Sequence, residues 1–166
     1  MTYPAQFCRN TGIQLLSLGC SGNCKMQSYF ADALVNAPDI DAFIFDSFSN
    51  PTIEEIRERL FPFIEKLQGA HPGKPLIFQH TIYRERRNFD LATEKNESER
   101  MRVVDELMAE AVKRYKDVYY VTTTNATSPK HDTSVDGTHP GDHGYSLWAE
   151  SIQKPILKIL RKYGIR

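Results

Sequence analysis

The sequence predicts an α/β fold built around a parallel sheet. Short apolar runs alternate along the chain with longer segments of helical periodicity, and the runs are rich in β-branched, leucine or aromatic residues. Strands of a parallel sheet are buried on both faces, which favours such continuous apolar runs over an alternating pattern. The runs that we interpret as strands are Ile13–Leu18, Ala42–Phe48, Pro75–Thr81 and Val118–Thr122.

The segments between these runs predict helices. The predicted helices are Met26–Asn36, Ile53–Gln68, Thr93–Tyr115 and Asp142–Tyr163. Thr52 and Glu55 form a T-x-x-E capping box at the start of the second helix. Asp142 is placed to cap the last helix, and Pro155 should kink that helix or end it early. The charged stretch from Arg84 to Asn96 predicts an exposed loop that enters a helix.

Length and composition limit the classes of protein that the chain can belong to. Its 166 residues predict a single domain, residues 1–166, and no apolar run is long enough to span a bilayer. With 21 basic and 21 acidic residues, the balance of charge does not favour a nucleic-acid partner. Three cysteines argue against a disulfide framework. The opening MTYPAQFCRN has no signal-peptide pattern, so the chain as written is expected in the cytoplasm; residues upstream of Met1 would reopen a secreted or periplasmic location.

The most informative motif is D-G-T-H-P, from Asp136 to Pro140, just before the last predicted helix. A carboxylate three residues before a histidine can accept a hydrogen bond from one imidazole nitrogen, which leaves the other nitrogen free as a general base. A D-x-x-H pair on its own is common in solvated polar loops. Its place before the final helix of an α/β domain is what favours a catalytic function for Asp136 and His139.

Two further motifs directly follow predicted strands. L-G-C-S-G-N, residues 18–23, has glycines whose amides can approach and bind an oxyanion, although the same residues also form a plain tight turn. Asn50 either donates its side-chain amide to a developing oxyanion or is a turn residue before Pro51. Open α/β sheets bind ligands at the carboxyl ends of their strands, so we assign both motifs to one candidate site.

Together these motifs resemble the SGNH hydrolase superfamily, which includes the GDSL-like lipases and esterases, and the resemblance runs from Tyr3 to the final helix. It implies a flavodoxin-like three-layer sandwich and a serine esterase. The implied substrate is a small-molecule or carbohydrate ester, with acetyl or short acyl groups, and no metal or organic cofactor is implied. By the same resemblance, His139 and Asp136 are catalytic residues, while Gly22 and Asn50 form the oxyanion hole.

The chain departs from the family at its start. In that family a strand ending in a G-x-S motif, which carries the nucleophilic serine, precedes the helix that Tyr3–Arg9 begins; here the chain opens with Met1. That strand is central in such sheets, so its loss should leave a gap and unpaired backbone groups on its neighbours. We expect a swapped element, a partner chain in an oligomer, or rearranged strands to fill the gap.

Three alternatives remain open from the sequence. Ser21 is an alternative nucleophile, although its position in the family belongs to the oxyanion loop. The competing function is a catalytically inactive remnant or binding protein that keeps the pocket without the nucleophile. A zinc site can also be drawn, but the spacing fits no standard structural-zinc pattern, and we predict no metal. The residues of that hypothetical zinc site are Cys20, Cys24, His80, His131, His139 and His143.

Overall fold

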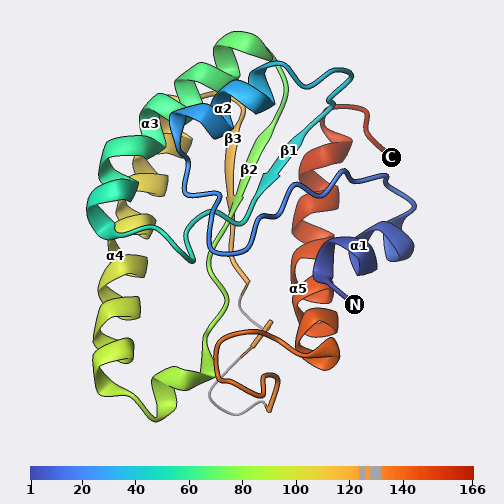
Figure 1. Cartoon of the computed structure of the whole chain (residues 1–166). Helices are drawn as coiled ribbons and strands as arrows, with labels where there is room; N and C mark the ends of the chain where they lie inside the picture. The colour runs from blue at the N-terminus through green and yellow to red at the C-terminus, as the bar shows by residue number, and fades with distance from the viewer. Residues whose placement is uncertain (124–125, 128–131) are drawn as a thin grey trace.

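A computed structural model of the chain describes residues 1–123, 126–127 and 132–166, and it confirms the α/β fold with a parallel sheet (Figure 1). The strands are β1 (Phe43–Phe45), β2 (Leu76–Gln79) and β3 (Val118–Val121). Their spatial order is β1-β2-β3, and both pairs are parallel. Three of the four predicted strands are therefore present, each shorter than its apolar run.

Helices cover both faces of this sheet, which makes three layers (Figure 1). The layer on one face consists of α2 (Ser28–Val35), α3 (Ile53–Ala70) and α4 (Leu91–Arg114). The layer on the other face consists of α1 (Tyr3–Thr11) and α5 (Asp142–Arg161). A short 3-10 helix, η1 (Glu85–Asn88), leads from the end of β2 into α4. In the part of the chain that the structure describes, no helix has both the length and the apolar content needed to cross a membrane.

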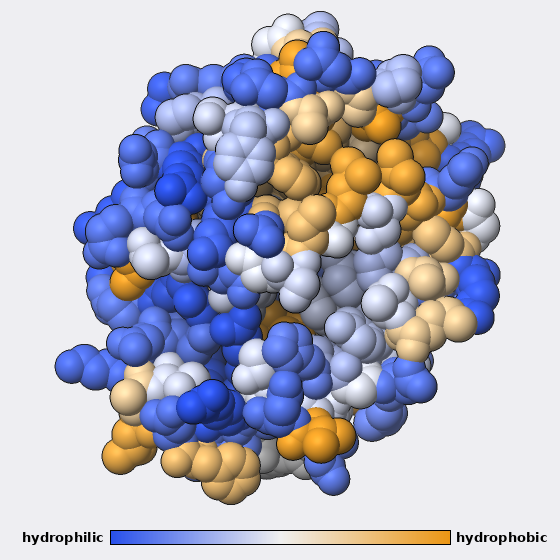
Figure 2. All heavy atoms as spheres, viewed as in Figure 1, coloured by the Kyte–Doolittle hydropathy of each residue, from blue (hydrophilic) through white to orange (hydrophobic). Residues whose placement is uncertain are grey.

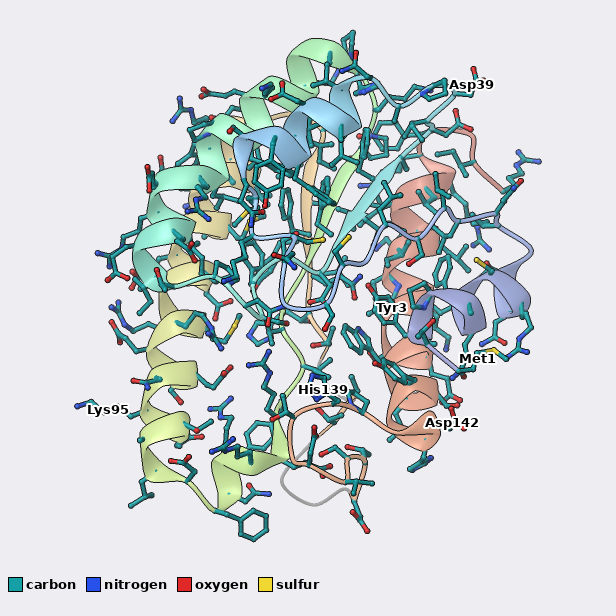
Figure 3. All side chains as sticks on the ribbon, viewed as in Figure 1. Met1, Tyr3, Asp39, Lys95, His139 and Asp142 are labelled. Atoms are coloured by element: carbon teal, nitrogen blue, oxygen red, sulfur yellow. The ribbon has the colours of Figure 1, made fainter. Side chains whose placement is uncertain are left out.

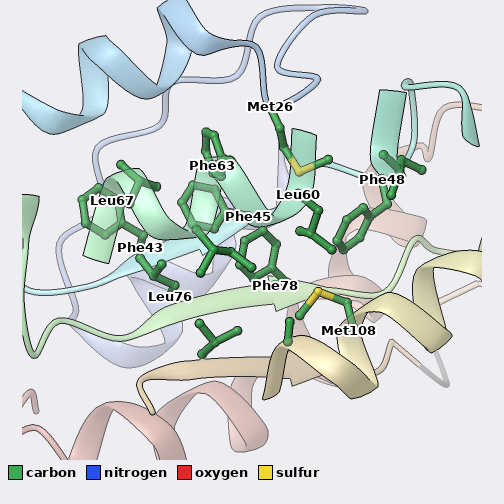
Figure 4. Packing of buried hydrophobic residues seen from close by; sticks show 14 of the residues in the cluster. Met26, Phe43, Phe45, Phe48, Leu60, Phe63, Leu67, Leu76, Phe78 and Met108 are labelled. Atoms are coloured by element: carbon green, nitrogen blue, oxygen red, sulfur yellow. The ribbon is translucent and has the colours of Figure 1, made fainter. Parts of the chain in front are cut away.

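Each face of the sheet carries its own apolar core. Neighbouring strand residues point to opposite faces, so Phe78 packs towards α3 and α4, whereas Ile77 packs towards α1 and α5. In the first core the rings of Phe45 and Phe78 lie 4.8 Å apart (Figure 4). In the second, Tyr3 of α1 stacks on Trp148 of α5 with ring centroids 4.1 Å apart. The two cores fix the sheet between its helices.

The start of α3 has the predicted cap, whereas the Asp142 cap and an early end of α5 at Pro155 are wrong. The Glu55 N–H donates to Thr52 Oγ1 (3.2 Å), and the Thr52 N–H donates to Glu55 Oε2 (2.9 Å). Asp142 does not cap α5, because Gly141 occupies the cap position and the Asp142 carboxylate pairs instead with the amino terminus of Met1. Nor does Pro155 end α5 early, since a buried stripe continues on both sides of it and holds the helix against the sheet.

The predicted strand Ile13–Leu18 is also wrong as a strand. The segment runs alongside β1 without forming a ladder (Figure 1), and Leu16 is 75% exposed. A strand needs a neighbour to pair with, and between this segment and β1 lies a cavity of about 900 Å³. Residues 13–19, residues 42–47 and the α5 side chains facing them line this cavity, which we call the β1 groove.

The β1 groove lies along an unpaired edge of the sheet; that it is the gap left by a missing strand stays a prediction. Among the described residues β1 pairs with β2 alone, so its other edge leaves backbone groups without a ladder partner. Apolar side chains gather around a hollow on this side of the molecule (Figure 2). The described residues supply no strand there. Rearrangement of the chain's own described strands therefore does not fill the gap.

Candidate active site

Asp136 and His139 form a hydrogen-bonded pair in the loop before α5, beyond the carboxyl ends of the strands (Figure 3). His139 Nδ1 donates to Asp136 Oδ2 over 2.6 Å. The other carboxylate oxygen accepts the backbone N–H groups of His139 (2.7 Å) and Thr138 (2.8 Å). These three donors hold the pKa of Asp136 well below its usual value. An ionised Asp136 keeps the proton on Nδ1 and leaves Nε2 as the basic nitrogen.

This pair is formed but largely uncovered. The His139 side chain is 77% exposed and that of Asp136 is 55% exposed. His139 Nε2 makes no hydrogen bond to any residue that the structure describes. A substrate, or a hydroxyl that needs a general base, therefore has direct access to this nitrogen.

The loop that carries the pair is closed at its base. Ser134 and Pro140 form an isolated antiparallel bridge, and the Gly141 N–H donates to the Thr133 carbonyl over 2.8 Å. Asp136 lies inside the closed turn. We call residues 133–141 the dyad loop.

Gly137 of the D-G-T-H-P motif and Gly144, just after it, are required by close backbone contacts. Gly137 has φ +75°, a left-handed conformation, and a Cβ there would lie 2.9 Å from the Arg86 backbone nitrogen. Gly144 lies in the first turn of α5, where a Cβ would lie 2.7 Å from the Thr133 carbonyl oxygen. The glycines thus allow η1 and α5 to approach the dyad loop from two sides.

The structure does not bring the other predicted site residues into contact with this pair. Gly22 has φ +68° in an exposed turn in which the Asn23 N–H donates to the Cys20 carbonyl over 2.9 Å. Asn50 is exposed between β1 and α3. Among the described residues, no hydrogen bond or ion pair joins Ser21, Gly22 or Asn50 to Asp136 or His139. Among these residues only the Asp136–His139 contact is therefore formed, and the catalytic roles of all of them stay predictions.

Asp46 is a candidate site residue that the sequence analysis missed. It follows β1, is half-buried and lines the β1 groove. Burial raises its pKa to about 6, against the opposing effects of the Ser49 hydroxyl, 3.3 Å away, and the Arg84 charge. The available signal was a carboxylate within a buried run, since Asp46 falls inside the predicted strand Ala42–Phe48.

The hypothetical zinc ligands do not gather in the described structure. Across residues 1–123, 126–127 and 132–166, no group of three or more His, Cys, Asp or Glu side chains is placed to hold a metal ion. The Cys20 and Cys24 thiols instead both approach the Leu18 carbonyl, at 3.7 and 3.6 Å. His131 lies outside the described residues.

Comparisons with solved structures place this fold beside two larger proteins. A protein described as a GDSL-like lipase from Bacteroides ovatus superposes with a TM-score of 0.86 at 33% identity, over 96% of this chain and 47% of that one. The salicylyl-acyltransferase SsfX3 of a tetracycline biosynthetic pathway superposes with a TM-score of 0.72 at 20% identity, over 99% of this chain and 50% of that one. The second likeness shows the fold alone. The chain spans about half the length of each protein.

A comparison with family models covers nearly the whole sequence. No curated protein matches the chain. The model of the GDSL-like lipase/acylhydrolase family matches residues 1–158, a span that includes the dyad loop, the turn at Gly22 and Asn50. The chain therefore belongs to the GDSL-like lipase/acylhydrolase family.

Proposed function

We propose that the chain carries the acid–base half of a serine ester hydrolase. The observation that carries the proposal is the 2.6 Å contact between His139 Nδ1 and Asp136 Oδ2, with Nε2 left accessible. In this arrangement His139 takes the proton of a serine hydroxyl, and Asp136 orients the imidazole and stabilises its charged form. Membership in an acylhydrolase family supports the same reaction class.

The proposed reaction has two acyl-transfer steps. The serine oxygen attacks the ester carbonyl while His139 accepts its proton; the Gly22 N–H and the Asn50 amide then stabilise the tetrahedral oxyanion, each contributing about 3 kcal/mol. His139 returns the proton to the leaving alcohol as the acyl-enzyme forms. In the second step, water attacks the acyl-enzyme carbonyl while His139 accepts its proton, and His139 returns that proton to the serine oxygen as the acid is released. This sequence of steps uses no metal or organic cofactor.

We further propose that the serine comes from a strand docked on the free edge of β1. A swapped element, a partner chain or a segment outside these residues would supply that strand. The β1 groove supports the idea because it follows β1 to Ser47 at the carboxyl end, the end of the sheet beyond which His139 lies (Figure 3). Ser21 remains the alternative nucleophile, and it differs from a docked serine in where a covalent adduct would form.

The proposed substrates are esters of acetyl or other short acyl groups, including those on carbohydrate. The Asp136–His139 pair is open to solvent, so none of the side chains that the structure describes keeps a sugar alcohol group from His139 Nε2. No nucleic-acid partner enters the proposal.

Hydrolysis of p-nitrophenyl acetate and of an acetylated xylo-oligosaccharide tests this function on the natively expressed protein. His139→Ala should lower the rate by about 100-fold or more, the range expected for loss of a general base. His143→Ala is the matched control, because His143 is an exposed histidine only four residues away. Equal rates in the wild type and His139→Ala would contradict the proposal and favour the inactive remnant or binding protein.

A further inference from the structure

Glu85 is a buried carboxylate in a stretch that the sequence predicted as an exposed loop. Its side chain belongs to η1, and the residue is only 7% exposed. Glu85 Oε1 accepts hydrogen bonds from the Thr133 N–H (2.8 Å) and from the Thr133 hydroxyl. Oε2 accepts from the Ser134 N–H (3.2 Å) and hydroxyl (3.4 Å). All four donors come from the first two residues of the dyad loop.

The two sequence neighbours of Glu85 also hydrogen-bond to loops of the candidate site. The Arg86 N–H donates to the Gly137 carbonyl over 2.8 Å, so the dyad loop is held on both sides of Asp136. Arg84 Nη2 donates to the Ser49 carbonyl over 2.9 Å, next to Asn50. The three consecutive residues Arg84, Glu85 and Arg86 thus connect the segment at Ser49 and Asn50 with the dyad loop.

The ionisation state of Glu85 favours stable hydrogen bonds to Thr133 and Ser134. Burial of a carboxylate is unfavourable unless hydrogen bonds replace its water. Burial by itself raises the pKa of Glu85, but the hydrogen bonds from Thr133 and Ser134 outweigh this effect and hold the pKa below its usual value. Glu85 is therefore an ionised acceptor at neutral pH, and its hydrogen bonds to the loop are charge-assisted.

We propose that Glu85 is a positioning residue that fixes the dyad loop, so that Asp136 and His139 keep their hydrogen-bonded geometry at the Asn50 side of the site. The inference rests on the proposed function, since the geometry matters to catalysis only if the pair acts there. Glu85 itself does not touch the dyad; it acts through Thr133 and Ser134.

The test measures the pKa of Asp136 by ¹³C NMR of its carboxyl group in the purified chain, a readout that needs no catalysis. In Glu85→Gln, the amide NH2 group of the new side chain faces the Ser134 N–H and hydroxyl, which are donors themselves, so these hydrogen bonds are lost. The dyad loop should then hold the donors to Asp136 less firmly, and the pKa of Asp136 should rise by about 1 towards its usual value of about 3.9. Thr133→Val removes one donor and should give a smaller rise. Thr133→Ser keeps the hydroxyl and should leave the pKa unchanged.

Glu94→Gln is the matched control. Glu94 pairs with Arg87 of the same η1 over 2.5 Å but does not reach the dyad loop. An unchanged pKa of Asp136 in folded Glu85→Gln, or an equal rise in Glu94→Gln, would overturn the proposal. Global unfolding of both Glu85→Gln and Thr133→Val would overturn it too, because Glu85 would then serve general stability. A rise in the pKa together with no effect of His139→Ala on hydrolysis would refute the proposed function but keep the positioning role.

Discussion

At the scale of single residues, the Asp136–His139 pair is assembled almost entirely by its own loop. Two backbone N–H groups and one imidazole N–H converge on a single carboxylate within four residues of sequence. The contact itself is local, whereas Glu85 and Arg86 of η1 hold the loop that carries it. The pair is solvent-exposed, however, so salt screens its electrostatic attraction more than it would screen that of a buried pair.

The lowered pKa of Asp136 predicts a pH-dependent contribution to stability. The folded pKa lies below the unfolded value of about 3.9. The ionised carboxylate therefore stabilises the folded state above about pH 4, and this contribution is lost as the pH falls towards the folded pKa. In urea denaturation between pH 2 and 5, the wild type should lose its advantage over Asp136→Asn as the pH falls. A difference in midpoint that stays constant over this range would contradict the assignment.

The contact between Asp136 and His139 was predictable from the sequence because it is local, whereas the placement of Gly22 and Asn50 relative to that pair was not. Asp136 and His139 are three residues apart, so one loop decides their contact. The relation of Gly22 and Asn50 to the pair depends on how distant loops pack. Glu85 was misjudged for a similar reason: its burial depends on a loop 48 residues away, while its charged neighbours indicate only an exposed segment.

At the scale of elements, the first turn of α5 packs directly beneath the dyad loop. Gly144→Ala would place a Cβ 2.7 Å from the Thr133 carbonyl oxygen and 2.8 Å from the Pro140 side chain. Relieving this overlap requires a shift of the backbone at Thr133, which is unfavourable. The substitution should therefore lower the free energy of unfolding by about 1–3 kcal/mol. Gly69→Ala in α3 is the control; a Cβ there meets nothing within 4 Å, and it should be neutral or stabilise by up to about 1 kcal/mol. Urea denaturation measures both, and a Gly144→Ala variant as stable as the wild type would contradict this packing.

Among the elements, the start of α3 was predicted correctly because its signal lies within one segment. The capping box at Thr52 needs only Glu55, and both hydrogen bonds are present. The strand Ile13–Leu18 failed because a strand exists only through a neighbouring strand, and the segment faces the β1 groove instead. The cap at Asp142 failed because a distant group, the amino terminus, pairs with its carboxylate.

At the scale of the whole molecule, the β1 groove opens the α/β core along one sheet edge, with a volume of about 900 Å³. It exposes apolar side chains beside a sheet edge, a combination that favours binding of a further strand or an apolar ligand. The sequence led us to expect an open sheet edge only through the resemblance to a family, because no local pattern in these residues marks such an edge.

The open groove predicts that the native chain binds the apolar dye ANS. Leu18 is partly exposed and lines the groove, so Leu18→Asp should weaken dye binding about tenfold, equivalent to about 1.4 kcal/mol. Phe89→Asp is the matched control, since Phe89 is 89% exposed but lies at the end of η1 rather than in the groove. Fluorescence titration of the folded proteins checks this. Absence of dye binding to the native wild type would mean that the groove is closed in solution.

The most direct test of the central claim, that Asp136 and His139 activate a serine, is fluorophosphonate labelling followed by mass spectrometry. The natively expressed protein is used, together with any chain that copurifies with it. We predict a serine adduct that forms with the wild type and with His143→Ala but not with His139→Ala. The position of the adduct distinguishes Ser21 from a serine on a docked strand. Absence of any adduct on folded wild-type protein, or an adduct that persists in His139→Ala, would contradict the claim.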